Sequence, residues 1–291
     1  MSRRPVVGLT LGDPAGIGPE LAAKVVRRTG RKKSPKLIGT AQGVRPGHPS
    51  LAGARQAWAA LEESVRLLKR KEIQAVVNAP VSKEWLARAG FRFPGQTEFY
   101  ASRFGKKADA VTMCMVGPRL RVALATTHLS LRQAAAGLKT SAIVRSGVHL
   151  AELLKKMGIR KPRIAVCGLN PHASEGGLFG KEDQRVVGPA VRQLRKKGRL
   201  AFVGPEPADT VFRRAIRGEF DGVVALYHDQ GLIPAKLLDF DRTVNVTMGL
   251  PVVRCSPDHG TAFGIAGKGK ARPESMLEAV KLAHRLVGGR R

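Results

Sequence analysis

The sequence predicts an α/β protein with three layers, α/β/α, built around a mostly parallel sheet. Short apolar segments alternate with amphipathic segments along the whole chain, as strands and helices do when helices cover both faces of a sheet. The 291 residues, 43% of them apolar, are enough for one large or two medium domains with a sizeable core. Neither an internal repeat nor a low-complexity linker interrupts this pattern.

The predicted strands are short, continuous apolar runs. Strands of a parallel sheet are buried on both faces, so they lack the alternation of a half-exposed strand. The segments that fit lie at residues 6–11, 75–78, 110–116, 121–125, 164–167, 201–203, 222–226 and 244–247.

The predicted helices carry apolar residues on one face. In the segment ALEESVRLL, Leu61, Val65 and Leu68 recur at the i, i+4, i+7 spacing of a buried helix face, and the last helix has Met276 and Val280 in the same relation. The helices are predicted at residues 18–28, 54–70, 82–89, 141–157, 183–197, 209–216 and 274–287.

The composition excludes several classes of protein. The three cysteines are far apart and form no CxxC pair, which argues against both a disulfide framework and a thiolate zinc site. No run of about 18 apolar residues is present, so no membrane span is expected. The apolar stretch 6–11 is too short for a secretory signal and ends in a Gly/Pro turn. We therefore expect a cytoplasmic protein.

The chain is strongly basic. It has 51 Lys and Arg against 22 Asp and Glu, a net charge of +29. Basic clusters lie at residues 27–36, 67–71, 154–163 and 192–199, each at the end of a predicted helix or in the following loop. They indicate either a solvated basic surface or attraction of anions. Only 5% of the residues are aromatic and none interleave with the basic clusters, which argues against nucleic acid as the main partner.

Three histidines follow the carboxyl ends of predicted strands. His128 follows the run VALA, His172 follows IAVC, and His228 follows VVALY. Ligands bind at this edge in open α/β sheets, and strand ends can converge there although they are distant in sequence. Three imidazoles would form a divalent-metal site with an open position. Each histidine alone could equally cap a helix or bond to the backbone.

Two glycine-rich segments flank the chain. GDPAGIGPE follows the first predicted strand, and Gly12, Gly16 and Gly18 permit a tight turn that either simply joins strand to helix or lines a cofactor or anion pocket. It does not match the GxGxxG spacing. DHGTAFGIAGKGKARPE, residues 258–274, combines small residues with basic ones whose backbone donors and cations could hold a nucleotide.

Taken together, these segments resemble the 4-hydroxythreonine-4-phosphate dehydrogenase family of vitamin B6 biosynthesis. The two glycine-rich segments are also distantly similar to those of isopropylmalate and isocitrate dehydrogenases, which use them around NAD on a fold that is not the Rossmann fold. The resemblance spans nearly the whole chain and rests on GDPAGIGPE, NAPVSKEWL, FPGQTEF, ALATTHLSLR, CGLNPHASEGGLFGKED, GPEPADTVF, YHDQGLIPAK, VNVTMGLPVVR and DHGTAFGIAGKGKA.

The resemblance implies an isopropylmalate-dehydrogenase-like fold of two subdomains with a cleft between them. One subdomain would comprise residues 1–97 and 248–291 and carry the glycine turn and the NAD loop. The other, residues 98–247, would carry the metal histidines and the dimer contacts. It further implies a homodimer whose active site is completed by the other subunit.

The resemblance also assigns site residues. The family's metal ligands fall on the three histidines already identified. A family histidine is replaced here by Gln96, which can hydrogen-bond but cannot carry a proton at neutral pH. The substrate contacts fall on Gln96, Thr97, Lys236, Asn245 and Arg254, and the NAD or NADP contacts on Gly12, Asp13, Gly16, His259, Gly260, Thr261, Gly267 and Lys268.

The implied reaction is the NAD(P)-linked oxidation of 4-phosphohydroxy-L-threonine to 2-amino-3-oxo-4-phosphooxybutanoate. This product decarboxylates to 3-amino-2-oxopropyl phosphate in pyridoxal phosphate biosynthesis. The expected metal is zinc, with magnesium, cobalt or manganese as alternatives. Lys236 is the candidate for proton transfer. Asp229 would orient a histidine or the water on the metal, or else cap the following turn.

Two alternatives remain open at this point. A sibling dehydrogenase on the same scaffold would oxidise phosphorylated erythronate or threonate, or an aromatic cis-dihydrodiol. A basic binding protein without catalysis would instead account for the net charge.

Overall fold

The computed structural model describes residues 5–30, 33–197 and 201–288. Its contacts divide the chain into two compact units: unit 1 is Met1–Ala108 with Val244–Arg291, and unit 2 is Asp109–Thr243. The predicted boundaries were 97/98 and 247/248. Residues 98–108 group with unit 1 because Phe99 and Tyr100 are fully buried in its aromatic core.

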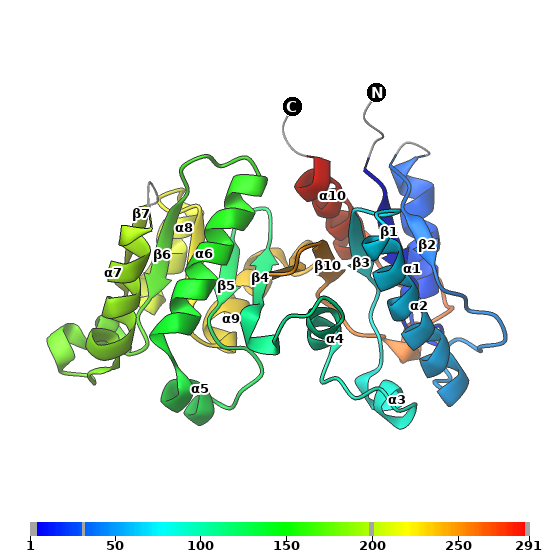
Figure 1. Cartoon of the computed structure of the whole chain (residues 1–291), viewed down its shortest axis with the longest axis horizontal. Helices are drawn as coiled ribbons and strands as arrows, with labels where there is room; N and C mark the ends of the chain where they lie inside the picture. The colour runs from blue at the N-terminus through cyan, green and yellow to red at the C-terminus, as the bar shows by residue number, and fades with distance from the viewer. Residues whose placement is uncertain (1–4, 31–32, 198–200, 289–291) are drawn as a thin grey trace. The chain divides into compact units, whose positions relative to one another are not determined.

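Unit 1 carries five strands among its described residues, in the order β2-β1-β3-β10-β9 (Figure 1). All pair in parallel except β9, which is antiparallel to β10. The strands are β1 (Val7–Thr10), β2 (Lys36–Ile38), β3 (Ala75–Asn78), β9 (Val244–Met248) and β10 (Val253–Pro257). The helices are α1 (Gly18–Thr29), α2 (Leu51–Lys69), α3 (Lys83–Arg88), α4 (Gln96–Arg103) and α10 (Glu274–Gly288), with a short 3-10 turn at Phe263–Ile265.

The predicted apolar faces form the core of unit 1. Leu61, Val65 and Leu68 of α2 are buried in one cluster with Phe91, Phe99 and Tyr100, and the rings of Phe99 and Tyr100 meet edge to face. Met276 and Val280 of α10 are also buried. The helical periodicity therefore identified the buried faces correctly.

Unit 2 carries five strands among its described residues, in the order β4-β5-β8-β6-β7. Only the β4–β5 pair is antiparallel. The strands are β4 (Thr112–Val116), β5 (Arg121–Leu124), β6 (Arg163–Cys167), β7 (Ala201–Glu206) and β8 (Gly222–Ala225). The helices are α5 (Leu131–Gly137), α6 (Thr140–Lys156), α7 (Gly188–Lys196), α8 (Ala208–Ile216) and α9 (His228–Asp239), with irregular turns at Ala108–Ala110, Pro171–Gly177 and Asp183–Val187.

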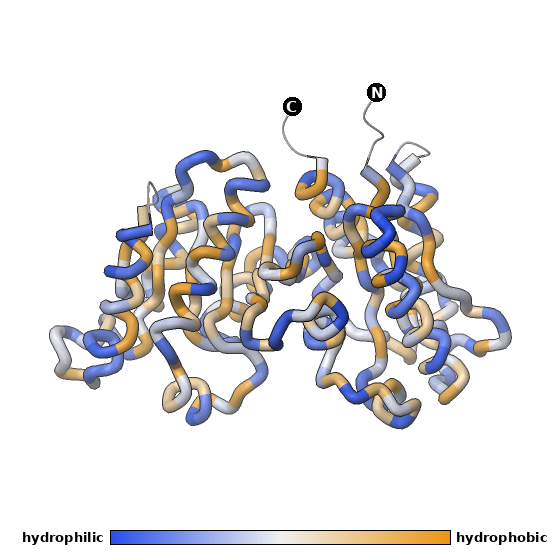
Figure 2. Tube along the Cα trace, in the orientation of Figure 1, coloured by the Kyte–Doolittle hydropathy of each residue, from blue (hydrophilic) through white to orange (hydrophobic). Residues whose placement is uncertain are grey.

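Within each unit the hydropathy follows the layers (Figure 2). Apolar segments lie along the strands and on one side of the helices, and polar segments lie at helix ends and in loops.

All three cysteines are buried free thiols, and burial raises the pKa of the Cys255 thiol to about 12. No helix in the described part of the chain is long and apolar enough to cross a membrane.

The prediction of elements was wrong in five places. It missed β2, β10, α4, α5 and α9. Helix α9 contains Gly231 and Pro234, which ordinarily oppose a helix interior. Gly231 is needed there because a Cβ would lie 2.7 Å from the side chain of Leu124, so α9 packs tightly on β5.

Candidate active site

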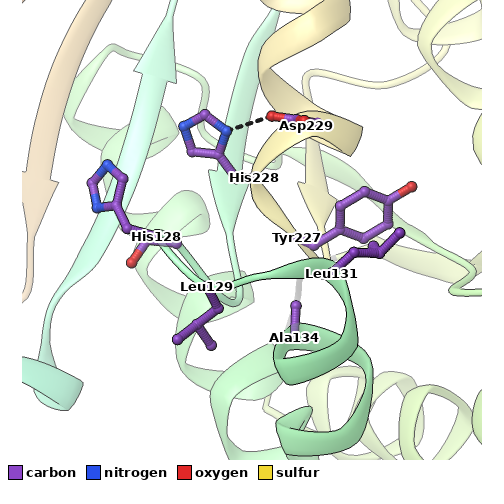
Figure 3. Close-up of a pocket in the computed structure, with 8 residues that line it drawn as sticks. His128, Leu129, Leu131, Ala134, Tyr227, His228 and Asp229 are labelled. Carbon is purple, nitrogen blue, oxygen red and sulfur yellow. Dashed lines mark hydrogen bonds and ion pairs between the residues drawn. The ribbon is translucent and has the colours of Figure 1, made fainter.

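Two of the predicted histidines meet at the ends of neighbouring strands in unit 2. β5 and β8 pair in parallel, with Leu124 opposite Ala225. Beyond the strands, Thr126 continues the contact, since its hydroxyl donates to the Leu226 carbonyl at 2.8 Å. The following residues are thereby held together, and the rings of His128 and His228 lie with their centres 5.6 Å apart, tilted by 42° (Figure 3).

The spacing of this histidine pair fits a shared metal ion. Two imidazoles on one tetrahedral Zn²⁺ at an ordinary Zn–N distance have ring centres about 5 Å apart. His228 Nδ1 lies 2.7 Å from Asp229 Oδ1, which leaves Nε2 for a ligand. A carboxylate on the second ring nitrogen is the usual support for a metal-binding histidine. The structure therefore gives Asp229 a position that suits the predicted orienting role.

His172 does not join this pair in the described chain. It follows β6, which borders β8 on the side away from β5, so the three histidines do follow three adjacent strands. Its ring instead lies 6.1 Å from the ring of Phe179. Within residues 5–30, 33–197 and 201–288, no group of three His, Cys, Asp or Glu is arranged to hold a metal. The three-histidine metal site thus stays a prediction.

The segment that carries His172 has an unusual backbone. Residues 172–176 all have positive φ, from 42° to 72°, and four of them are not glycine. Such backbone persists only where its surroundings fix it, and it is frequent at functional sites. Here the buried Asp183 fixes it by accepting hydrogen bonds from Leu169 N at 2.6 Å, Asn170 N at 3.1 Å and Ser174 Oγ at 2.6 Å. The sequence analysis missed Asp183 because an acid at the start of a predicted helix looks like an ordinary dipole partner.

A pocket of about 240 Å³ adjoins the histidine pair. Its remaining lining is largely apolar and comes from the segments after β5 and β8 (Figure 3). Partial burial raises the pKa of Tyr227, so its phenol stays protonated at neutral pH. Lys236 lies two turns beyond His228 on α9, outside the pocket lining. The lining residues are Thr127, His128, Leu129, Leu131, Ala134, Tyr227, His228 and Asp229.

Arg254, a predicted substrate contact, is a buried cation on β10 of unit 1. Its side chain is held by Asn78 Oδ1 at 2.8 Å, Thr247 Oγ1 at 3.2 Å and Gln96 Oε1 at 3.3 Å. All three partners are neutral. Burial lowers the pKa of the guanidinium, which nonetheless remains charged at neutral pH. A desolvated cation whose hydrogen-bond partners are neutral is suited to bind an anionic ligand.

A hydrogen-bonded chain behind Arg254 was missed by the sequence analysis. Asn78 donates to the hydroxyl of Tyr100 at 2.8 Å, and that hydroxyl lies 2.5 Å from Ser64 Oγ. Asn78 ends the apolar strand AVVN, which is the same signal that identified the strand-end histidines. The chain orients Asn78 so that its carbonyl oxygen faces the guanidinium.

The other predicted substrate contacts lie near the same strands of unit 1. Gln96 begins α4, donates to the Ala79 carbonyl at 3.3 Å, and is followed directly by Thr97. Asn245 lies on β9, and its Oδ1 is buried with no hydrogen-bond partner among the residues that the structure describes. A buried carbonyl oxygen left unpaired is costly, so a ligand donor would stabilise it.

The two glycine-rich segments contact each other directly. Ile17 N donates to the Thr261 carbonyl at 2.9 Å, and a Cβ on Gly16 would lie 2.9 Å from that oxygen. Gly12 has φ +69°, and a Cβ there would lie 2.3 Å from the Pro80 carbonyl oxygen. Asp13 is buried, which raises the pKa of its carboxyl group, and it accepts from Ala15 N at 3.0 Å. The two glycine-rich segments that the sequence analysis considered together therefore also lie together in the structure.

Among the described residues, the loop at residues 258–270 offers an unpaired ring nitrogen and open backbone to a ligand. His259 Nε2 is buried and lacks a partner in the described chain, and a side chain at Gly260 would meet open space. Lys268 Nζ donates to the Gly264 carbonyl at 2.7 Å. Lys24 of α1 fastens the end of the loop by donating to the Gly269 and Ala271 carbonyls, each at 2.7 Å. A fixed loop with an unpaired donor or acceptor and open backbone fits a nucleotide cofactor.

These features define a class of protein: an α/β enzyme fold with its site residues at the carboxyl ends of parallel strands. The same fold occurs in isocitrate dehydrogenase from Methylococcus capsulatus, with a TM-score of 0.56 and 14% identity over 98% of this chain and 86% of that one. The predicted α/β fold of isocitrate dehydrogenase type is thus confirmed.

The chain belongs to the PdxA family of pyridoxal phosphate biosynthetic proteins, whose family model matches residues 18–283. It is 41% identical to the 4-hydroxythreonine-4-phosphate dehydrogenase of Caulobacter vibrioides, over 100% of this chain and 99% of that protein. It is 39% identical to the D-threonate 4-phosphate dehydrogenase of Cupriavidus necator, over 95% and 96%. The predictions of the family and of an oxidoreductase are therefore confirmed.

Two solved structures are also similar along the whole chain. A 4-hydroxythreonine-4-phosphate dehydrogenase from Klebsiella pneumoniae has a TM-score of 0.84 and 36% identity over 97% of this chain and 99% of that one. A terephthalate 1,2-cis-dihydrodiol dehydrogenase from Burkholderia xenovorans has a TM-score of 0.72 and 30% identity over 97% and 98%.

Proposed function

We propose that the chain is a cytoplasmic dehydrogenase that oxidises 4-phosphohydroxy-L-threonine with NAD or NADP and a divalent metal, preferably zinc. The observation that carries this proposal is the His128–His228 pair at adjacent strand ends, in a chain whose family match covers residues 18–283. The product, 2-amino-3-oxo-4-phosphooxybutanoate, is a β-keto acid and loses CO2 to give 3-amino-2-oxopropyl phosphate.

The metal would be held by His128, His172 and His228. When bound, the cation supplies a Lewis acid that polarises the substrate hydroxyl, and the nicotinamide supplies the hydride acceptor. Asp229 keeps the His228 ring in orientation through the 2.7 Å contact with Nδ1. Lys236 is the residue that we assign to proton transfer from the hydroxyl and to the carbon that loses CO2.

Arg254 would bind the phosphate or carboxylate of the substrate. Charge-assisted bonds from a guanidinium to such groups are strong, and burial from water strengthens them. Asn245 would add a neutral hydrogen bond, because its Oδ1 is unpaired among the described residues. Gln96 would add another beside Arg254, from which its Oε1 accepts. Thr97 would add a hydroxyl next to Gln96.

A homodimer would complete the site. His172 lies outside the group formed by His128 and His228, so a second copy of the chain could supply the third ligand. An exposed apolar stripe on α9 and the residue that follows it supports such a contact: Ile233, Leu237 and Phe240 are 64%, 84% and 64% exposed at i, i+4, i+7 spacing. Apolar patches of this kind mark protein interfaces, and α9 begins at His228 itself.

A sibling dehydrogenase is the second candidate. The pocket beside the histidines is lined by Leu129, Leu131 and Ala134, which would suit an apolar or aromatic substrate such as a cis-dihydrodiol. Phosphorylated threonate or erythronate would instead keep both anionic groups for Arg254 and Lys236. Arg254 favours a substrate with a phosphate or carboxylate, because a diol without an anionic group would leave its buried charge uncompensated.

A substrate panel decides between these candidates. The purified protein is incubated with NAD or NADP, a divalent metal, and phosphohydroxythreonine, phosphothreonate, phosphoerythronate or a cis-dihydrodiol in turn. Mass spectrometry of the product should show 3-amino-2-oxopropyl phosphate from phosphohydroxythreonine, with the highest kcat/KM. A higher kcat/KM for any other member would contradict the assigned substrate.

Asp229→Asn should weaken metal binding by about 10- to 100-fold, which is the usual effect of removing a ligand's supporting carboxylate. The asparagine can still hydrogen-bond Nδ1, but it no longer raises the basicity of the imidazole. Isothermal titration of the metal-stripped protein with Zn²⁺ measures the change directly. An unchanged affinity would leave Asp229 only a favourable charge interaction with the N-terminus of α9, whose first turn it occupies.

A further inference from the structure

The basic clusters of the sequence gather at one edge of unit 2. α6 ends at Lys156 and leads into β6, and α7 ends at Lys196 and leads into β7. β6 and β7 pair in parallel from Arg163 opposite Ala201. The helices also pack closely, since a Cβ on Gly147 of α6 would lie 2.8 Å from Leu194 of α7. The last turn of α7 therefore packs beside the middle of α6, and both helices lead into the amino ends of neighbouring strands.

Six exposed cations occupy these helix ends and the loop between α6 and β6. None of them forms an ion pair or a side-chain hydrogen bond within the residues that the structure describes. Residues 198–199 of the sequence cluster lie outside the described residues. The six, which we call the basic edge, are Lys155, Lys156, Arg160, Lys161, Lys196 and Lys197.

One exposed carboxylate, Glu152 of α6, lies one turn before the two lysines that end this helix, whereas two carboxylates near the amino ends of the strands are engaged elsewhere. Asp221 accepts from Arg163 N at 2.7 Å and pairs with its guanidinium at 3.7 Å. Glu219 pairs with Arg214. The six cations outnumber this carboxylate, so the basic edge keeps an excess of positive charge that is exposed to solvent and available to an external anion.

The location of the basic edge separates it from the dehydrogenase chemistry. The histidines follow the carboxyl ends of β5, β6 and β8, whereas the basic edge lies at the amino ends. Figure 1 shows α5, which follows His128, at one end of the strands and the loop from α6 to β6 at the other. Cations in the last turn of a helix stabilise its dipole by only tenths of a kcal/mol to about 1 kcal/mol. That role does not apply to Arg160 and Lys161, which lie beyond α6.

We propose that the basic edge binds the phosphate backbone of nucleic acid without reading its sequence, a function beyond the dehydrogenase activity. Several cations on one edge can neutralise successive phosphates and release their counterions. With only 5% aromatic residues, the chain offers little for base stacking, so the contact is electrostatic. Binding of this kind has a Kd of about 10⁻⁴ to 10⁻⁶ M at physiological salt.

The test compares two variants with the same net charge. The edge variant replaces Lys155, Lys156, Lys196 and Lys197 by Gln. The control variant replaces four exposed lysines on loops that are not part of the basic edge, Lys106, Lys107, Lys139 and Lys181, by Gln. Fluorescence anisotropy of a short labelled DNA duplex of mixed sequence gives the affinity of each protein at several salt concentrations between about 50 and 200 mM.

The native chain should bind with an affinity that falls steeply with salt. The edge variant should lose about 3 to 4 units from the slope of log K against log salt, and the control less than about 1, since each lost phosphate contact removes about one unit. Both variants should keep dehydrogenase turnover, which shows that they are folded. Equal losses in the two variants, or no binding by the native chain at about 50 mM salt, would overturn the proposal. Tighter binding to phosphatidylserine vesicles than to DNA at equal phosphate concentration would also overturn it.

Discussion

His228→Ala should lower metal-dependent NAD(P) reduction by about 10³-fold or more, because a Lewis acid contributes several kcal/mol to this kind of oxidation. His228 provides one ring of the pair at 5.6 Å, and its Nδ1 contacts the carboxylate of Asp229 at 2.7 Å. His172→Ala should have an effect of the same size if it is the third ligand. Steady-state kinetics with added Zn²⁺ measure both losses, and circular dichroism confirms that the variants are folded. Full turnover in the metal-stripped native chain would contradict the metal mechanism itself.

The same two variants distinguish a shared site from a site within one chain. If His172 of one subunit joins His128 and His228 of another, a mixed dimer of His172→Ala and His228→Ala contains one intact site. Random exchange makes half of the dimers mixed, so about a quarter of the native activity should return. Two copies of His228→Ala mixed with each other provide the matched control. No recovery after verified subunit exchange would place all three ligands in one chain.

Arg254→Met should lower kcat/KM for phosphohydroxythreonine by about 10²- to 10³-fold, since truncating one partner of a buried charged contact removes about 2–5 kcal/mol. The effect on stability should be much smaller. The methionine relieves the desolvation of a buried cation, which offsets the loss of the bonds to Asn78, Thr247 and Gln96. Steady-state kinetics measure the loss of kcat/KM, and thermal unfolding of the same variant measures the effect on stability.

Two further variants sharpen the test of Arg254. Arg254→Lys keeps the charge but loses the planar fork, so it should recover only part of the activity. Gln96→His should raise activity on phosphohydroxythreonine or leave it nearly unchanged, because histidine can also bond to an anion. Native kcat/KM in Arg254→Met, or a large loss in Gln96→His, would mean that the pocket is built for another substrate.

The sequence located the strand ends that carry the candidate site residues, whereas it missed several elements. Polar residues that end apolar strands are a local signal, and this signal identified His128, His172 and His228. It also applied to Asn78, which was overlooked. Pairing of β5 with β8 is a contact between residues about a hundred positions apart, so no local pattern could show which histidines meet. The ring of His172 lies apart because five positive φ angles redirect the chain after β6.

The missed elements have a similar cause. α9 contains a glycine and a proline that local propensity counts against a helix, and the close approach of Gly231 to Leu124 outweighs that preference. β10 carries Arg254 in the middle of its run, which hides the strand from a search for apolar segments. A charged residue inside a buried strand is unusual, and Arg254 is also the buried cation to which we assign substrate binding.

The three buried thiols can report local unfolding of the native chain. Cys114 on β4 and Cys167 on β6 belong to unit 2, and Cys255 on β10 belongs to unit 1. An alkylating reagent can reach each sulfur only when the surrounding strands open. Peptide-resolved alkylation rates would therefore give the opening free energy of each half of the enzyme separately, without an engineered label.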